Sequence, residues 1–248
     1  MNGERRSYLY ALVRPADIAI DATGIDAAPV RIVSGQDIGA VVSTVSADTF
    51  DPALMEDRMA DLQWVETVAR AHDDVVNAAA RVATTIPLRL GTTSDDDDTV
   101  RELVTDLTPA ARRSFDRLQG RAEYGVQVFG PARRATTAAA RSEGGAAFLR
   151  RRRAELQQDE VERAAVAEQA TTAFDSLARL AADSRRNPLR DVGPGVAGTM
   201  LLNGAFLIEQ DEVPAFRTAV DDLAAAFGPQ RVVITGPWAP YSFADLEP

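Results

Sequence analysis

The chain has 248 residues, 46% of them hydrophobic, which is enough to bury one large core or two smaller ones. Its formal net charge of −10 disfavours non-specific binding to nucleic acid, because such binding depends on neutralising phosphates. Without cysteine the chain has no disulfide and no thiolate ligand for zinc or iron–sulfur clusters, and no apolar run approaches the roughly 18 residues of a membrane span, so we expect a soluble cytoplasmic protein.

The first half of the chain is expected to contain strands followed by a long helix. Strands are predicted at residues 8–13 and 38–45, with a weaker one at residues 30–33 between them. A helix is predicted over about residues 53–84, because its apolar side chains recur every three or four positions, and a short strand follows at residues 86–90. The residues assigned to the buried face of this helix are Met55, Met59, Leu62, Val65, Ala69, His72, Val76 and Ala79.

A second helix completes this half of the chain. Ser94 is expected to cap it, and Thr108 with Pro109 to restart it, since proline suits a first helical position. Gly120 ends the helix. Its buried stripe is made of Val100, Leu103, Val104 and Leu107. We therefore expect an N-terminal α+β domain over residues 1–120.

The second half has the order strand, helix, strand, strand, helix, strand. The predicted elements are a strand at 124–128, a helix at 146–186, strands at 192–197 and 199–209, a helix at 213–227 and a strand at 231–235. This order is that of a ferredoxin-like split βαβ unit. We therefore expect residues 121–248 to form a ferredoxin-like domain with an extended helix, in a two-domain chain of the α+β class.

The end of the chain is rigid and aromatic. Gly236 and Pro237 are expected to stop the last strand, and Trp238, Tyr241 and Phe243 follow, spaced by prolines. Chain ends are usually polar and frayed. Three large aromatics therefore indicate that this segment packs against a surface, either of its own domain or of a partner.

Two acidic or ionisable features favour a structural role. His72 is the only histidine, and a lone histidine on an apolar helix face is typical of a hydrogen-bonded core residue rather than a metal ligand. The carboxylate run at residues 95–98 could bind a hard cation, but the EF-hand pattern needs glycine and glutamate where Val100 and Asp106 stand. Negative charge just after the Ser94 cap suits a helix N-terminus instead.

A glycine motif and a basic block give little support for a binding function. Residues 193–198 match GxGxxG, but a helix lies upstream and a strand downstream, the reverse of what dinucleotide binding requires. The four arginines at 150–153 spread around a helix and are followed closely by acidic residues, which favours a solvated face. We predict no catalytic constellation, no metal site and no cofactor.

Several segments together resemble the GvpL/GvpF family of gas vesicle proteins. The closing residues 235–243 (TGPWAPYSF) look like the family's TGPWPPYSF, and residues 86–92 (IPLRLGT) look like its PLRFGT. Further matches are residues 8–13, Trp64 with residues 71–75, and residues 123–126. The departures are Ala239, Leu90, Tyr124, Asp73 and Gln127, and most of them preserve size or polarity.

The resemblance implies a non-enzymatic accessory or minor structural protein of gas vesicle formation, located in the cytoplasm and at the gas vesicle. Such a protein is expected to contact the small, very hydrophobic shell protein and other vesicle accessory proteins, without a cofactor and without catalytic residues. A ferredoxin-like second domain is also implied. Our hypothesis for the partner-binding surface is the aromatic end, Trp238, Tyr241 and Phe243, with Pro87 and Arg89 nearby; the same residues could instead form the interface between the domains.

Two other classes remain open. Ferredoxin-like domains host many functions, so the chain could be a small-molecule-binding or regulatory module. It could also be an enzyme of unrecognised type, which a pocket joining His72, Arg89 and a carboxylate would favour.

Overall fold

The computed structural model describes residues 4–51, 54–130, 145–190, 199–228 and 231–246. The chain has a mixed α/β fold with two antiparallel sheets. It divides into two compact units, which we call unit 1 (Met1–Glu123 with Pro237–Pro248) and unit 2 (Tyr124–Gly236). None of the described helices is long and apolar enough to cross a membrane.

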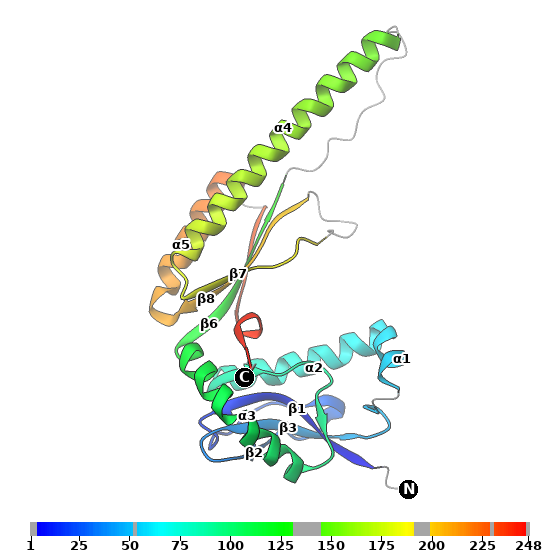
Figure 1. The fold of residues 1–248 in the computed structure, drawn as a ribbon, viewed down its shortest axis with the longest axis vertical. Helices are drawn as coiled ribbons and strands as arrows, with labels where there is room; N and C mark the ends of the chain where they lie inside the picture. The colour runs from blue at the N-terminus through cyan, green and yellow to red at the C-terminus, as the bar shows by residue number, and fades with distance from the viewer. Residues whose placement is uncertain (1–3, 52–53, 131–144, 191–198, 229–230, 247–248) are drawn as a thin grey trace. The chain divides into compact units, whose positions relative to one another are not determined.

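The sheet of unit 1 is built around a strand that pairs on both sides (Figure 1). Strand β1 (Arg5–Arg14) pairs antiparallel with β3 (Gly39–Ser46), β4 (Thr84–Pro87) and β5 (Thr93–Ser94), and β2 (Arg31–Ser34) pairs with the outer side of β3. Residues Tyr8 to Val13 are all inaccessible to solvent. Such an unbroken run, in place of alternation, is typical of a strand covered on both faces, and β1 contacts both α2 and α3.

The helix predicted over residues 53–84 is two helices, α1 (Met55–Ala60) and α2 (Leu62–Ala80). Asp61 has extended backbone angles and caps α2, its carboxylate accepting hydrogen bonds from Gln63 N (3.1 Å) and Trp64 N (3.2 Å). His72 is buried as predicted, but two residues assigned to the buried face are exposed: Leu62, in the first turn of α2, is 80% exposed, and Met59, in α1, is 48% exposed.

Helix α3 (Asp97–Leu118) is continuous, so the predicted restart at Pro109 is wrong. Its cap is Asp96 and not Ser94: the Asp96 carboxylate accepts hydrogen bonds from Thr99 N and Oγ1, both at 2.8 Å. Next to the cap, Asp97 accepts two hydrogen bonds from the Arg31 guanidinium (2.6 and 3.2 Å), which lowers the pKa of this carboxyl. The acidic run therefore caps and pairs within unit 1.

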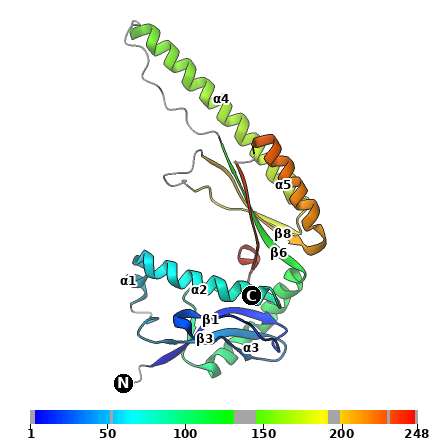
Figure 2. The same ribbon diagram turned by 180° about the vertical axis from the view of Figure 1, so that it is seen from behind.

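Unit 2 contains a four-stranded sheet in the order β7-β8-β6-β9 (Figure 2). Its elements are β6 (Arg121–Phe129), α4 (Gly145–Ala178), β7 (Asp183–Arg186), β8 (Met200–Glu209), α5 (Val213–Phe227) and β9 (Val232–Trp238). Single-turn 3-10 helices are η1 (Ile25–Ala27) and η3 (Tyr241–Phe243) in unit 1 and η2 (Gln210–Glu212) in unit 2. Phe174, Phe206 and Phe216 form the aromatic core of unit 2, with neighbouring ring centroids 5.2 and 5.5 Å apart.

Two details of unit 2 differ from the prediction. The helix expected to reach residue 186 ends at Ala178, and β7 follows it, paired with β8. The predicted strand at 192–197 lies outside the described residues. Strand β9 also continues through Gly236, whose φ of +111° suits glycine, and ends at Trp238 rather than before Gly236.

Candidate functional site

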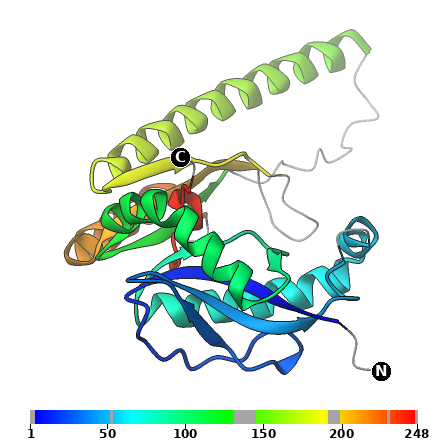
Figure 3. The same cartoon turned by 60° about the horizontal axis from the view of Figure 1, so that its bottom comes forward.

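The last described residues form a segment held against unit 1, and we call residues 237–246 the closing segment (Figure 3). Ser242 donates hydrogen bonds from N and Oγ to the two carboxylate oxygens of Glu123, at 2.8 and 2.6 Å. The Tyr241 hydroxyl donates to Asp73 Oδ1 of α2 at 2.8 Å. Carboxylates therefore fix both the backbone and the aromatic side chain of this segment.

Helix α3 holds the end of the segment. Arg117 donates to the Phe243 carbonyl, and the Ser114 hydroxyl donates to the Asp245 carbonyl. Arg117 also forms an ion pair with the Asp245 carboxylate at 3.5 Å. Between these contacts the Phe243 ring is fully buried. Side chains of α3 thus satisfy backbone carbonyls that a frayed chain end would leave to water.

The aromatic residues of the closing segment fall into two groups by exposure. Phe243 is buried, and so is Ala239, which belongs to the hydrophobic core cluster around Tyr8 and β1. Trp238 is 47% exposed and Tyr241 is 42% exposed. Phe243 and Ala239 therefore anchor the segment, whereas Trp238 and Tyr241 present apolar surface to the solvent.

The predicted Pro87–Arg89 region contributes to the same core. Pro87 is buried at the end of β4, opposite Ala11 of β1. The Arg89 side chain is exposed, and its carbonyl accepts hydrogen bonds from Thr92 N and Oγ1. Leu90 packs against the core cluster that includes Ala239 of the closing segment. The structure thus places Pro87 and Arg89 with the closing segment in unit 1.

His72 is buried among tyrosines beneath the closing segment. Its Nδ1 lies 3.0 Å from the Tyr8 hydroxyl, which accepts a hydrogen bond from Gly91 N at 3.0 Å. Either group can donate in this contact, depending on which imidazole nitrogen carries the hydrogen. Nε2 is buried and has no hydrogen-bond partner among the described residues. The Tyr241 ring lies 6.4 Å from the imidazole, centroid to centroid.

Burial dominates the ionisation of this cluster. It lowers the pKa of His72 below the ordinary 6.5, although the Asp73 charge and the Leu88 carbonyl oppose the shift. Burial also raises the pKa values of the Tyr8 and Tyr241 hydroxyls, and the Asp73 carboxylate adds to the effect at Tyr241. At neutral pH the imidazole and the two tyrosine hydroxyls are therefore uncharged.

These groups contribute to the packing of unit 1. The described residues contain no group of three His, Cys, Asp or Glu side chains that could hold a metal ion. His72 touches Tyr8 and not a nucleophile, and its free Nε2 is closed off from solvent. The arrangement can hold the closing segment and present its exposed aromatic rings.

Sequence reasoning missed the residues that hold the closing segment. Asp73 and Asn77 stand one turn apart on α2, and the Asn77 amide oxygen accepts from Ala239 N at 3.4 Å. Ser114 and Arg117 have the same kind of spacing on α3. A polar pair at such spacing beside an apolar stripe is a signal that could have indicated a docked segment.

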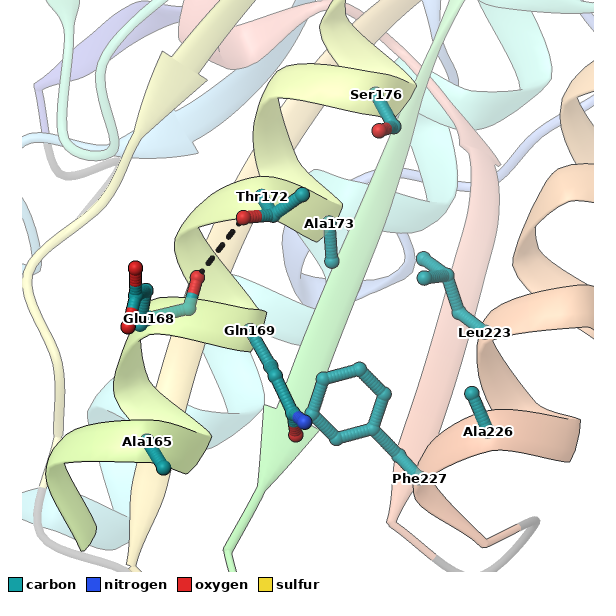
Figure 4. Close-up of a pocket in the computed structure, with 9 residues that line it drawn as sticks. All are labelled: Ala165, Glu168, Gln169, Thr172, Ala173, Ser176, Leu223, Ala226 and Phe227. Atoms are coloured by element: carbon teal, nitrogen blue, oxygen red, sulfur yellow. Dashed lines mark hydrogen bonds between the residues drawn. The ribbon is translucent and has the colours of Figure 1, made fainter. Parts of the chain in front are cut away.

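Unit 2 carries a separate surface feature, an open groove between α4 and α5 with a volume of about 510 Å³ (Figure 4). The two helices lie side by side and both contact β8. The lining residues are Ala165, Glu168, Gln169, Thr172, Ala173 and Ser176 of α4 and Leu223, Ala226 and Phe227 of α5. No sequence motif had pointed to it.

The remaining sequence features lie elsewhere. The glycine motif at 193–198 is outside the described residues. Arg150 and Arg153 on α4 are exposed, whereas the side chain of Arg151 is not described.

Comparison with known proteins gives consistent matches along the chain. A family model described as "Gas vesicle synthesis protein GvpL/GvpF" matches residues 6–245. The chain is similar to gas vesicle protein L of Streptomyces sp. (strain CB03234), with 36% identity over 99% of this chain and 95% of that protein. It is also similar to gas vesicle protein F1 of Halobacterium salinarum, with 24% identity over 96% and 92% of the two chains.

Solved structures share the fold. The crystal structure of GvpF from Anabaena sp. PCC7120 superposes with a TM-score of 0.70 at 21% identity, covering 97% of this chain and 96% of that one. GvpF from Microcystis aeruginosa gives a TM-score of 0.67 at 19% identity, covering 97% and 99%.

Proposed function

Because the chain belongs to the GvpL/GvpF family of gas vesicle synthesis proteins, we propose that it is a non-enzymatic assembly factor that binds the small hydrophobic shell protein early in vesicle formation. A shell protein that will line a gas space exposes apolar surface before it assembles. Such surface aggregates unless another protein covers it. A chain with a net charge of −10 and an exposed aromatic surface is suited to hold that partner in solution.

The proposed binding surface is the closing segment with the Pro87–Arg89 region. Trp238 and Tyr241 make the contact with the shell protein, and Arg89 is exposed beside the same core. Phe243 and Pro87 are buried and act as anchors. The observation that carries the proposal is the exposure of two large aromatics on a segment whose backbone is hydrogen-bonded to α2, to α3 and to Glu123, all within unit 1. A segment already ordered loses little entropy on binding.

We also propose that unit 2 is a ferredoxin-like domain, with the boundary of the N-terminal domain near Gly120. Two features support this. The elements of unit 2 follow the order strand, helix, strand, strand, helix, strand, with β7 in the place of the predicted strand at 192–197. The sheet order β7-β8-β6-β9 puts the first and third strands of the unit in the centre. The chain would act in the cytoplasm and at the vesicle, with other gas vesicle accessory proteins as further partners.

The test is capture of the purified shell protein by the tagged chain, with Trp238→Ala and Tyr241→Ala as variants. Each removes an exposed ring, so the fold is retained and shell-protein binding falls at least five-fold. Val82→Ala is the matched control, because Val82 is also an exposed apolar side chain of unit 1. If both aromatic variants fold and still bind the shell protein as the wild type does, the closing segment is not the binding surface.

A further inference from the structure

We propose that the groove between α4 and α5 binds an amphipathic α-helix of another protein, one with a narrow apolar stripe flanked by basic residues. This site lies wholly in unit 2 and does not depend on the closing segment or on shell-protein binding.

The walls of the groove have the shape that a helix requires. The residues of the α4 wall recur at steps of three and four, and apart from Glu168 and Gln169 they are small: Ala165, Thr172, Ala173 and Ser176 (Figure 4). Small residues leave room for the backbone of a third helix to approach. The α5 wall supplies Leu223 and Phe227, which are only half-buried and offer apolar contacts. A groove of this kind receives the apolar face of a helix through anchors spaced along it.

The length of the groove sets the length of its occupant. Ala165 and Ser176 are eleven positions apart on α4, or about 16 Å at ~1.5 Å per residue. Val161 stands one turn before Ala165 on the same side of the helix, and it is 70% exposed. Including Val161 lengthens the wall to about 22 Å, which matches four turns of a partner helix. A bound helix of that length would cover this otherwise unexplained apolar side chain.

Charge selects the chemistry of the partner. Glu168 lies in the α4 wall, and it is the one charged side chain among the lining residues. The lining residues include no basic side chain; Arg179 stands beyond one end, where it donates a hydrogen bond to Ser176 Oγ at 3.0 Å. The only formal charge that the lining residues bring to the groove is therefore negative. Lysine or arginine beside the apolar stripe of the partner would complement them.

The test uses two synthetic 18-residue helical peptides with the same leucine stripe, one with lysine and one with glutamate at the flanking positions. Fluorescence anisotropy measures their binding to the full chain. We expect the lysine peptide to bind at least ten-fold tighter than the glutamate peptide. Replacing Glu168 by glutamine should weaken the lysine peptide several-fold.

Groove-blocking variants locate the binding. Ala165→Arg and Ala226→Arg place a long side chain in the groove at exposed positions, and arginine is a good helix former, so both variants fold. Each should weaken the lysine peptide at least ten-fold. Ala167→Arg adds the same charge to an exposed position of α4 outside the groove and should stay within two-fold of the wild type.

Three outcomes would overturn the proposal. Equal binding of the lysine peptide to all variants would mean that it binds the acidic surface at large. Equal binding of the two peptides would remove the role of charge. A wild-type dimer that Ala165→Arg converts to a monomer in sedimentation would show that a second copy of the chain occupies the groove.

Discussion

Phe243→Ala should lower the free energy of unfolding of unit 1 far more than Trp238→Ala, although the two residues lie only five positions apart. Phe243 is fully buried, and removing a buried phenylalanine ring costs about 3–5 kcal/mol. Trp238 is half exposed, so Trp238→Ala should cost about 1 kcal/mol or less. With a urea dependence of about 2 kcal/mol per molar, the midpoint should fall by roughly 1.5–2.5 M for Phe243→Ala.

Urea titration followed by tryptophan fluorescence measures this difference, since Trp64 reports on the core of unit 1 in both variants. Phe243→Leu is the control: it keeps most of the buried volume and should cost about 1 kcal/mol. Hydrogen exchange at the Ser242 amide, which donates to Glu123, adds a local reading. If Phe243→Ala stays within about 1 kcal/mol of the wild type and Ser242 remains protected, the closing segment is not part of the core of unit 1.

Further predictions concern acid sensitivity and helix capping. Burial lowers the pKa of His72 in the folded state, so below pH 6.5 the unfolded chain binds a proton more readily than the folded chain, and the free energy of unfolding decreases as the pH is lowered. His72→Gln should flatten that slope below pH 6.5 relative to the wild type. The pKa of Asp97 is lowered by Arg31, so its contribution is present above the ordinary 3.8 and disappears as the pH falls through the lower folded value; Asp97→Asn should cost about 1 kcal/mol at pH 7 and leave unfolding less dependent on pH below 4. Asp61→Ala removes the α2 cap and should cost about 1 kcal/mol by urea titration, whereas Asp61→Ser should recover most of it.

Strongly patterned elements could be predicted from the sequence, and weakly patterned ones could not. Strand β8 and helix α5 were expected within a residue of their bounds, because each carries a clear apolar pattern. Strand β7 reads Asp-Ser-Arg-Arg and lies at the edge of its sheet, paired only with β8, so it needs no apolar face and leaves no periodic signal. The helix break at Asp61 was hidden because the apolar spacing continues across it.

The candidate site could be predicted only in part. The aromatic residues of the closing segment stand out by composition, and the structure does place Phe243 in a core. Which rings face outward depends on hydrogen bonds between residues more than 100 positions apart, such as Ser242 with Glu123. Local sequence pattern can mark a polar pair on a helix face, but it does not identify the distant residue that pairs with it. The groove of unit 2 escaped notice for the same reason, since it exists only where two helices distant in sequence meet.

The closing segment also sets the order in which the protein can mature. Unit 1 takes its sheet and helices from the first 123 residues, but it draws Ala239 and Phe243 from a stretch translated after all of unit 2. A nascent chain on the ribosome therefore holds an unfinished unit 1 throughout the synthesis of unit 2. Unit 1 can therefore be completed only after all of unit 2 has been synthesised.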